Sequence, residues 1–340
     1  MRTLHGLPRA GVVALALALA AAAAPLSAAS RSGNDLLSLV PADAASVAMI
    51  RWSDLRESPV AARLFSGVDH MTADGDAARF LEEAQLDPKK DVDTVVIAAK
   101  ASAGSKDTPM LALFDGRFDP ERLASAAQTR GAVRRSTSAG DYYLLPDKHS
   151  SDRGRPGAVA FVSSRLVIAG TESDVARALA DRQASGTGFA SGAGLGRELK
   201  RVDRGASVWV LVDVARYPSV GRRIAHVETS REDGGEPAMA ILGAMKSVSL
   251  VTVQASAHGD GLELSATGVT ADADTRQLLE DSLRGLIAMW RLAVQEKSPE
   301  LVSVLRKFTV SSDSEAVSIH GTLSGSALRA LTQKKHHSED

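Results

Sequence analysis

The sequence predicts an α+β fold of two similar lobes, each an antiparallel sheet covered by helices. Two observations predict it. Strand patterns follow one another with helical patterns interspersed, as in α+β proteins. Three segments also recur in the same order in the second half: 45–47 as 206–208, 92–98 as 248–254, and 166–171 as 317–322. We interpret the chain as a tandem duplication; chance similarity between strand-rich segments is the alternative.

Composition limits the function classes. The 340 residues are 44% hydrophobic and 24% charged, with 40 Lys and Arg, 41 Asp and Glu, and no cysteine. This is typical of a folded soluble protein. A formal net charge of −1 and an aromatic content of 4% argue against nucleic acid as a partner. Without cysteine, the chain forms no disulfide and no catalytic thiolate.

The N-terminus predicts export. Arg2 and Arg9 precede the apolar run 11–24, and small residues follow at 27–29. This layout is typical of a secretory signal peptide over residues 1–29, with cleavage after Ala29. A helix of the apolar run would be about 21 Å long, shorter than a hydrocarbon core of about 30 Å, so we expect no transmembrane span after signal removal. With abundant Ala, Gly and Arg, the sequence indicates a periplasmic or secreted bacterial protein.

The mature chain divides into two lobes on this interpretation. Residues 30–184 form the first α+β lobe and 197–332 the second, joined by the Gly/Ser-rich segment 185–196. Residues 333–340 form a polar tail, since they contain no apolar residue to anchor them.

In the first lobe, turn and cap signals separate the elements. Asp119 and Pro120 begin a helix that ends at Gly131, because Asp accepts from free first-turn amides and Gly adopts the left-handed closing conformation. Thr171 with Asp174 begins the closing helix. The expected strands are 46–52, 94–99, 110–114, 142–145, 158–162 and 166–169, and further helical regions are 59–65 and 74–85.

In the second lobe, strands 247–257 and 262–269 flank the turn 258–261, a hairpin signal. Asp274 with Gln277 begins the longest helix, which runs to about Lys297. Its apolar positions form one stripe suited to packing across a sheet: Leu279, Leu283, Leu286, Ile287, Trp290 and Val294.

Motifs for catalysis, metals and cofactors are weak. The sequence contains no Gly-x-Ser-x-Gly and no His-Glu-x-x-His, and Gly192-x-Gly194-x-Gly196 lacks the Lys-Ser/Thr ending of a phosphate-binding loop. The nearest approach to a catalytic cluster is the loop with Asp147, His149 and Ser150, which is more simply a solvated hairpin tip. We therefore expect no catalytic residue, no metal site and no cofactor.

One set of residues predicts a binding surface. Arginines lie on either side of a Tyr-Tyr strand, and in a meander they would converge into a basic patch with aromatic edges. Such a patch would hold an anionic group or a partner's acidic surface; the alternative is four scattered surface arginines. The candidate ligand-binding residues are Arg134, Arg135, Tyr142, Tyr143, Arg153 and Arg155.

The opening of the mature chain resembles a known group. Residues 39–43 read Leu-Val-Pro-Ala-Asp and precede the strand 46–52. This resembles uncharacterised exported bacterial proteins of domain-of-unknown-function type, in which a Pro-Ala-Asp or Pro-Ala-Asn element precedes the first strand and the unit is often doubled. The second half departs from the pattern, because residues 202–205 contain no proline. The resemblance implies export and a duplicated α+β unit, and it supplies no catalytic residue.

Together these observations favour a non-catalytic, exported binding or scaffold protein of the cell envelope, whose partner is an unknown envelope protein or a small ligand. Two alternatives stay open. One is an exported hydrolase with a site between the lobes. The other is a carrier of an apolar ligand held between sheet and long helix near Trp290.

Overall fold

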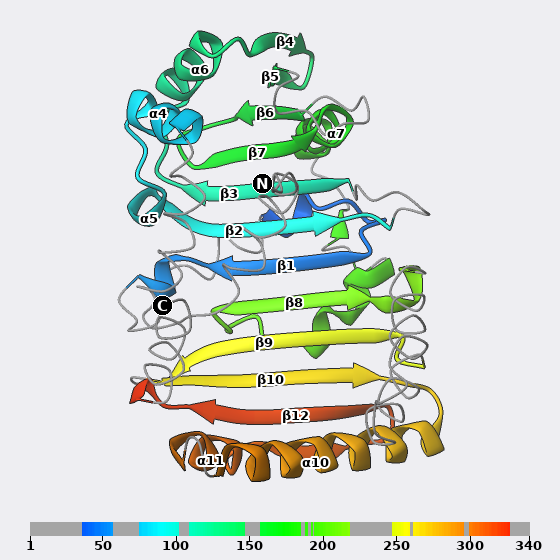
Figure 1. Cartoon of the computed structure of the whole chain (residues 1–340). Helices are drawn as coiled ribbons and strands as arrows, with labels where there is room; N and C mark the ends of the chain where they lie inside the picture. The colour runs from blue at the N-terminus through cyan, green and yellow to red at the C-terminus, as the bar shows by residue number, and fades with distance from the viewer. Residues whose placement is uncertain are drawn as a thin grey trace, which may run out of the picture.

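The computed structural model describes residues 36–56, 75–101, 109–146, 157–184, 188, 189, 192, 194–217, 247–258, 261–295 and 299–326. Over these ranges, twelve strands form one antiparallel sheet (Figure 1). The strand order is β11-β12-β10-β9-β8-β1-β2-β3-β7-β6-β5-β4. The α+β prediction is confirmed. The predicted signal peptide 1–29, the helical region 59–65 and the tail 333–340 lie outside the described residues.

The strands have these bounds: β1 Ser46–Arg51, β2 Val92–Ala99, β3 Met110–Gly116, β4 Val133–Thr137, β5 Gly140–Leu144, β6 Gly157–Phe161, β7 Leu166–Thr171, β8 Val208–Asp213, β9 Leu250–His258, β10 Gly261–Val269, β11 Thr309–Ser312 and β12 Ala316–Leu323. The helices are η1 Ser53–Leu55, α4 Gly75–Ala84, α5 Pro88–Asp91, α6 Pro120–Thr129, α7 Glu172–Gln183, η4 Gly194–Arg201, η5 Val214–Arg216, α10 Ala273–Gln295 and α11 Pro299–Leu305.

The two halves share this sheet through their first strands. β1 pairs antiparallel with β8, with Met49 opposite Trp209 and Ile50 opposite Val208. The prediction of a separate sheet in each half is therefore wrong. The physical reason is that both strands carry apolar side chains on both faces, so each is better buried as an interior strand than as a sheet edge.

The strand order in the two halves is the same when read outward from this pair. One half runs β1-β2-β3-β7-β6 and the other runs β8-β9-β10-β12-β11; the first half then adds β5 and β4. The three recurring sequence segments fall at β1 and β8, β2 and β9, and β7 and β12. Duplication stays a prediction, as do the lobe boundaries at 184 and 197.

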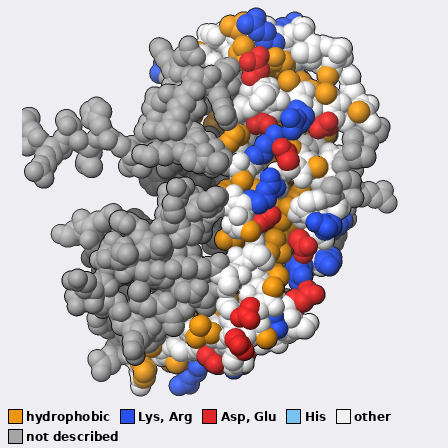
Figure 2. All heavy atoms as spheres, turned by 90° about the vertical axis from the view of Figure 1, so that its right-hand side faces the viewer, with side chains coloured by type: hydrophobic (Ala, Val, Ile, Leu, Met, Phe, Trp, Pro, Cys, Tyr) orange, Lys and Arg blue, Asp and Glu red, His pale blue; other side chains and the backbone are white. Residues whose placement is uncertain are grey.

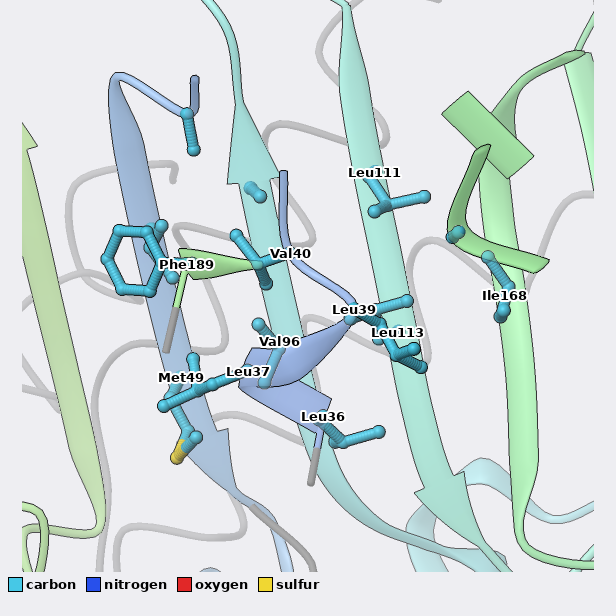
Figure 3. Packing of buried hydrophobic residues seen from close by; sticks show 14 of the residues in the cluster. Leu36, Leu37, Leu39, Val40, Met49, Val96, Leu111, Leu113, Ile168 and Phe189 are labelled. Atoms are coloured by element: carbon cyan, nitrogen blue, oxygen red, sulfur yellow. The ribbon is translucent and has the colours of Figure 1, made fainter. Parts of the chain in front are cut away.

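Each face of the sheet carries its own core. Figure 3 shows Leu36, Leu37, Leu39 and Val40 lying over β1, β2 and β3, where they meet Met49, Val96 and Leu113. Helix α7 packs on this same face through Val175 and Leu179. Leu55 of η1 and Leu123 of α6 pack on the opposite face against Ile50, Val95 and Ile97.

Most local predictions for the first half are confirmed. The Asp119 carboxylate accepts from the backbone amides of Glu121 and Arg122 at the start of α6, and Gly131 follows the helix with φ +84°. Thr171 accepts from the amide of Asp174 at the start of α7. β2 and β3 pair as the predicted hairpin strands. β4 was not predicted, because its residues Val133–Thr137 are all exposed and show no apolar alternation.

The long helix α10 differs from its prediction in two ways. Its N-terminal cap is Asp272, whose carboxylate accepts from the amide of Thr275 at 2.6 Å, and not Asp274. Leu279 of the predicted stripe is buried against Val248 and Val317, but Trp290 is 55% exposed. Because α10 lies over the outermost strands β11 and β12 (Figure 1), part of its apolar surface extends past the sheet edge.

Candidate functional site

The structure separates the arginines that the sequence grouped. Arg134 and Arg135 lie on β4, paired with Tyr143 and Tyr142 of β5. Paired residues share a face of the sheet and consecutive residues alternate between faces. Arg134 therefore lies on the face of Tyr143, and Arg135 on the opposite face with Tyr142. Arg153 and Arg155 lie outside the described residues, so ligand binding by this set stays a prediction.

The two tyrosines have structural partners. Both residues are 7% exposed. The Tyr142 hydroxyl donates to Glu172 Oε1 at 2.9 Å, and this hydrogen bond raises the pKa of Tyr142. The Tyr143 ring packs on Phe161, with centroids 5.5 Å apart. Arg134 is ion-paired with Asp141.

The alternative sites are only partly within the described residues. Asp147, His149 and Ser150 lie outside the described residues. Trp290 is more than half exposed and so does not line a space between sheet and helix. Among the residues with described positions, no group of three or more His, Asp and Glu side chains is placed to hold a metal ion.

A pocket lies elsewhere, at the end of the sheet where β2 and β7 begin and β3 ends. Its volume is 420 Å³. It is lined from the end of α4, the end of α5, the link between β3 and α6, the first turns of α6, and the turn between β6 and β7. The lining residues are Ala84, Gln85, Leu86, Asp91, Arg117, Phe118, Asp119, Arg122, Leu123, Ser164 and Arg165.

Arg165 is the most firmly positioned arginine of the lining. Its Nε and Nη2 donate to the two oxygens of Asp115 at 3.1 and 2.6 Å, and its Nη1 donates to Asp93 Oδ2 at 3.1 Å. Asp115 is 5% exposed, so a buried carboxylate holds the guanidinium in a bidentate geometry. A guanidinium has five N–H donors, and Arg165 uses three in these bonds.

Arg117 and Arg122 complete the basic part of the lining. Arg117 donates through Nη2 to the Lys90 carbonyl and lies 3.5 Å from Asp93 Oδ1. Arg122 Nε lies 3.0 Å from Asp119 Oδ2. All three arginine side chains are about half exposed, at 52 to 55%. About half of the surface of each of these side chains is therefore accessible.

The backbone around the pocket is tightly fitted. The Arg117 amide donates to the Asp91 carbonyl at 2.6 Å, and the Phe118 amide donates to the Ser164 carbonyl at 2.9 Å. A Cβ at Gly116 would lie 2.1 Å from the Asp91 carbonyl oxygen, so only glycine allows β3 and the end of α5 to come this close. These contacts fix the backbone positions of Arg117 and Phe118.

The arrangement is suited to binding an oxyanion. The lining holds three guanidinium groups and two carboxylates, Asp91 and Asp119. Asp93 and Asp115 also bind Arg165, so these three arginines and four aspartates together carry a net charge of −1. Attraction therefore depends on directed guanidinium donors at short range rather than on a long-range field. Leu86, Phe118 and Leu123 add an apolar side to the lining.

Sequence reasoning missed these arginines. Arg165 and Asp115 are 50 positions apart and Arg165 and Asp93 are 72 apart, so their meeting depends on which strands are neighbours. One signal was present: Arg117 follows the predicted strand 110–114, and Arg165 precedes the predicted strand 166–169. Side chains at those two ends meet once the strands pair antiparallel.

The opposite end of the sheet also carries charges, but they are matched. Lys100 Nζ lies 3.1 Å from Asp174 and 3.6 Å from Asp43, and Arg177 Nη1 lies 3.8 Å from Asp43. Figure 2, which faces this side of the molecule, shows basic and acidic side chains interspersed along it. This view shows no broad surface of one charge.

Comparisons with known proteins identify no relative by sequence. No protein family and no curated protein matches the chain. Solved structures of TP0453 are similar to it. Crystal form III has a TM-score of 0.46 at 10% identity, covering 86% of this chain and 96% of that one. Crystal form I has 0.38 at 12%, covering 87% and 95%, and crystal form IV has 0.39 at 10%, covering 87% and 95%. No described helix is long and apolar enough to cross a membrane.

Proposed function

We propose that the protein is an exported, non-catalytic binding protein of the bacterial cell envelope, and that the arginine pocket holds a carboxylate or phosphate group of its ligand. Export rests on the signal-like residues 1–29. Binding rests on one observation: three half-exposed guanidinium groups, oriented by carboxylates, line a 420 Å³ pocket.

Preorganisation is the physical basis of the binding role. Asp115 and Asp93 hold Arg165 before any ligand arrives, so a bound anion would not have to order that side chain. The ligand's oxygens would take the donors that the Asp contacts leave unused on Arg165, Arg117 and Arg122. Leu86 and Leu123 would contact an apolar part beside the anionic group.

A non-catalytic role fits the lining. Ser164 has the only hydroxyl among the lining residues, and neither histidine nor lysine lines the pocket to act as its base. The two lining aspartates are already engaged, because Asp91 accepts from the Asp87 amide and Asp119 from the amides of Glu121 and Arg122.

The test is calorimetric titration of the purified protein with hexyl phosphate, inorganic phosphate and hexanol. We expect hexyl phosphate to bind more tightly than inorganic phosphate, and hexanol not to bind, because the pocket has both a basic and an apolar side. Arg122→Gln should weaken hexyl phosphate binding about tenfold, or about 1.4 kcal/mol.

Arg134→Gln is the matched control. Arg134, like Arg122, is half exposed and ion-paired with an aspartate, but it lies on β4 away from the pocket. Its replacement should leave binding unchanged. If Arg134→Gln weakened binding and Arg122→Gln did not, the β4–β5 patch would be the site and the pocket proposal would be wrong. Recovery of the protein from the cytoplasm with residues 1–29 intact would contradict export.

A further inference from the structure

We propose that α10 is a self-association surface, on which two copies of this chain pair their α10 helices antiparallel with the twofold axis at Gly285. The inference is independent of the arginine pocket. It starts from large apolar side chains that the fold leaves in solvent on the outward side of this helix.

Three of the four exposed large apolar side chains of α10 are on the side that faces away from the sheet; the fourth, Trp290, belongs to the inward stripe. Leu278 and Met289 are each 46% exposed and Leu292 is 70% exposed. The inward side of the same helix packs through Leu279, Leu283 and Ile287 on β9, β11 and β12. Figure 1 shows α10 along the outer edge of the molecule, beyond β12, where a second molecule has access to it.

The spacing of these residues matches a helix-pairing seam. Leu278, Gly285 and Leu292 are seven residues apart, and Ser282 and Met289 lie four residues after the first two. Positions that alternate by four and three are the a and d positions of a heptad repeat. The seam covers fourteen residues, or about 21 Å of helix.

The seam is self-complementary, as a twofold interface must be. With the axis at Gly285, Leu278 of one copy lies against the partner's Leu292, and the reverse contact is identical. The two Gly285 residues meet at the centre. A Cβ at Gly285 would have no atom within 4 Å, so nothing in the described structure requires glycine there. Its small size would let the two backbones approach closely.

Charge favours a second copy over a lipid surface. The charged residues beside the seam are Asp274 and Asp281, and acidic flanks are repelled by anionic lipid headgroups. With the axis at Gly285, Asp281 lies level with the partner's Met289, so no like charge faces it within the seam. Antiparallel helices also oppose their dipoles favourably.

The first experiment is sedimentation of the purified full mature protein over a range of concentrations. One helix pair buries less than the about 800 Å² per partner of a standard interface, so we expect a reversible dimer with a dissociation constant in the range of about 10 μM. Leu292→Asp should weaken it at least about tenfold. Val133→Asp is the matched control, because Val133 is 51% exposed on β4 at the opposite edge of the sheet.

Cross-linking then tests the arrangement. Because the chain has no native cysteine, only the introduced thiols would react. Gly285→Cys should cross-link to itself through a short bis-maleimide, which reacts with two thiols. Leu278→Cys alone should not, since its two copies would be about 21 Å apart, but it should cross-link when mixed with Leu292→Cys. Self-cross-linking of Leu278→Cys would contradict the antiparallel pair. A monomer at all concentrations, or phosphatidylglycerol vesicle binding lost in Leu292→Asp without any dimer, would overturn the proposal.

Discussion

Arg51 shows how a single side chain joins the two halves. It is the last residue of β1 and is 7% exposed. Its guanidinium donates to the carbonyls of Arg204 and Ala206, which precede β8. Burial lowers the pKa of Arg51, and the charges of Asp54 and Asp203 oppose that shift. The buried guanidinium therefore has charged neighbours from both halves, Asp54 and Asp203.

Replacing this residue should be costly. Arg51→Met removes the charged donors and leaves two carbonyls of the β8 approach without them. We expect the free energy of unfolding to fall by about 2 to 4 kcal/mol. Urea unfolding followed by circular dichroism measures this. Arg134→Met, at an exposed arginine, should cost less than about 0.5 kcal/mol; equal losses in the two variants would show that Arg51 has no special role.

The arginine pocket could not be predicted from the spacing of residues along the sequence. Arg134 and Arg135 were grouped because they are adjacent in sequence, yet adjacency in a strand places them on opposite faces. Arg165 and Asp115 could not be grouped, because their contact depends on β3 pairing with β7. Local spacing predicts helical faces well, but it carries no information about which strand ends meet.

At the scale of the element, cap and turn chemistry was the most predictable part. The start of α6 at Asp119-Pro120 and the hairpin of β9 and β10 follow from residues within a few positions of each other. β4 could not be predicted, since an exposed edge strand needs no apolar alternation. For α10, Asp272 and Asp274 are both plausible caps, and only the backbone path selects Asp272.

The turn between β11 and β12 gives a prediction about acid stability. Asp313 Oδ1 accepts from the backbone amides of Glu315 and Ala316 at 2.7 and 2.8 Å, and these bonds lower the pKa of Asp313 below the ordinary 3.8. A carboxyl with a lowered folded pKa stabilises the protein above its unfolded pKa. That contribution is lost as the pH falls through the folded pKa.

Asp313→Asn should therefore reduce the loss of stability that acidification causes. An asparagine keeps an acceptor oxygen but does not titrate. The melting temperature of the variant should therefore fall less than that of the wild type between about pH 5 and about pH 2.5. Thermal melts across this range measure the difference. Wild-type and variant curves that run parallel on acidification would show that Asp313 has no linked proton.

At the scale of the whole molecule, the sequence predicted the α+β class and the positions of most strands along the chain, but it predicted two sheets instead of one. Periodicity shows that β1 and β8 are apolar on both faces. It does not show that each is the other's neighbour, since Met49 and Trp209 are 160 positions apart. Among the described strands, completing the sheet this way leaves β4 and β11 as edges and places α10 along one of them.

Hydrogen exchange of the backbone amides tests the single sheet most directly. If β1 and β8 pair at the centre, the amides of Val47 to Ile50 and of Val208 to Val212 should exchange as slowly as those of β2 and β9, and more slowly than those of the edge strand β4. Fast exchange in both β1 and β8, at the rate of β4, would mean that two separate sheets end there and would contradict the fold described above.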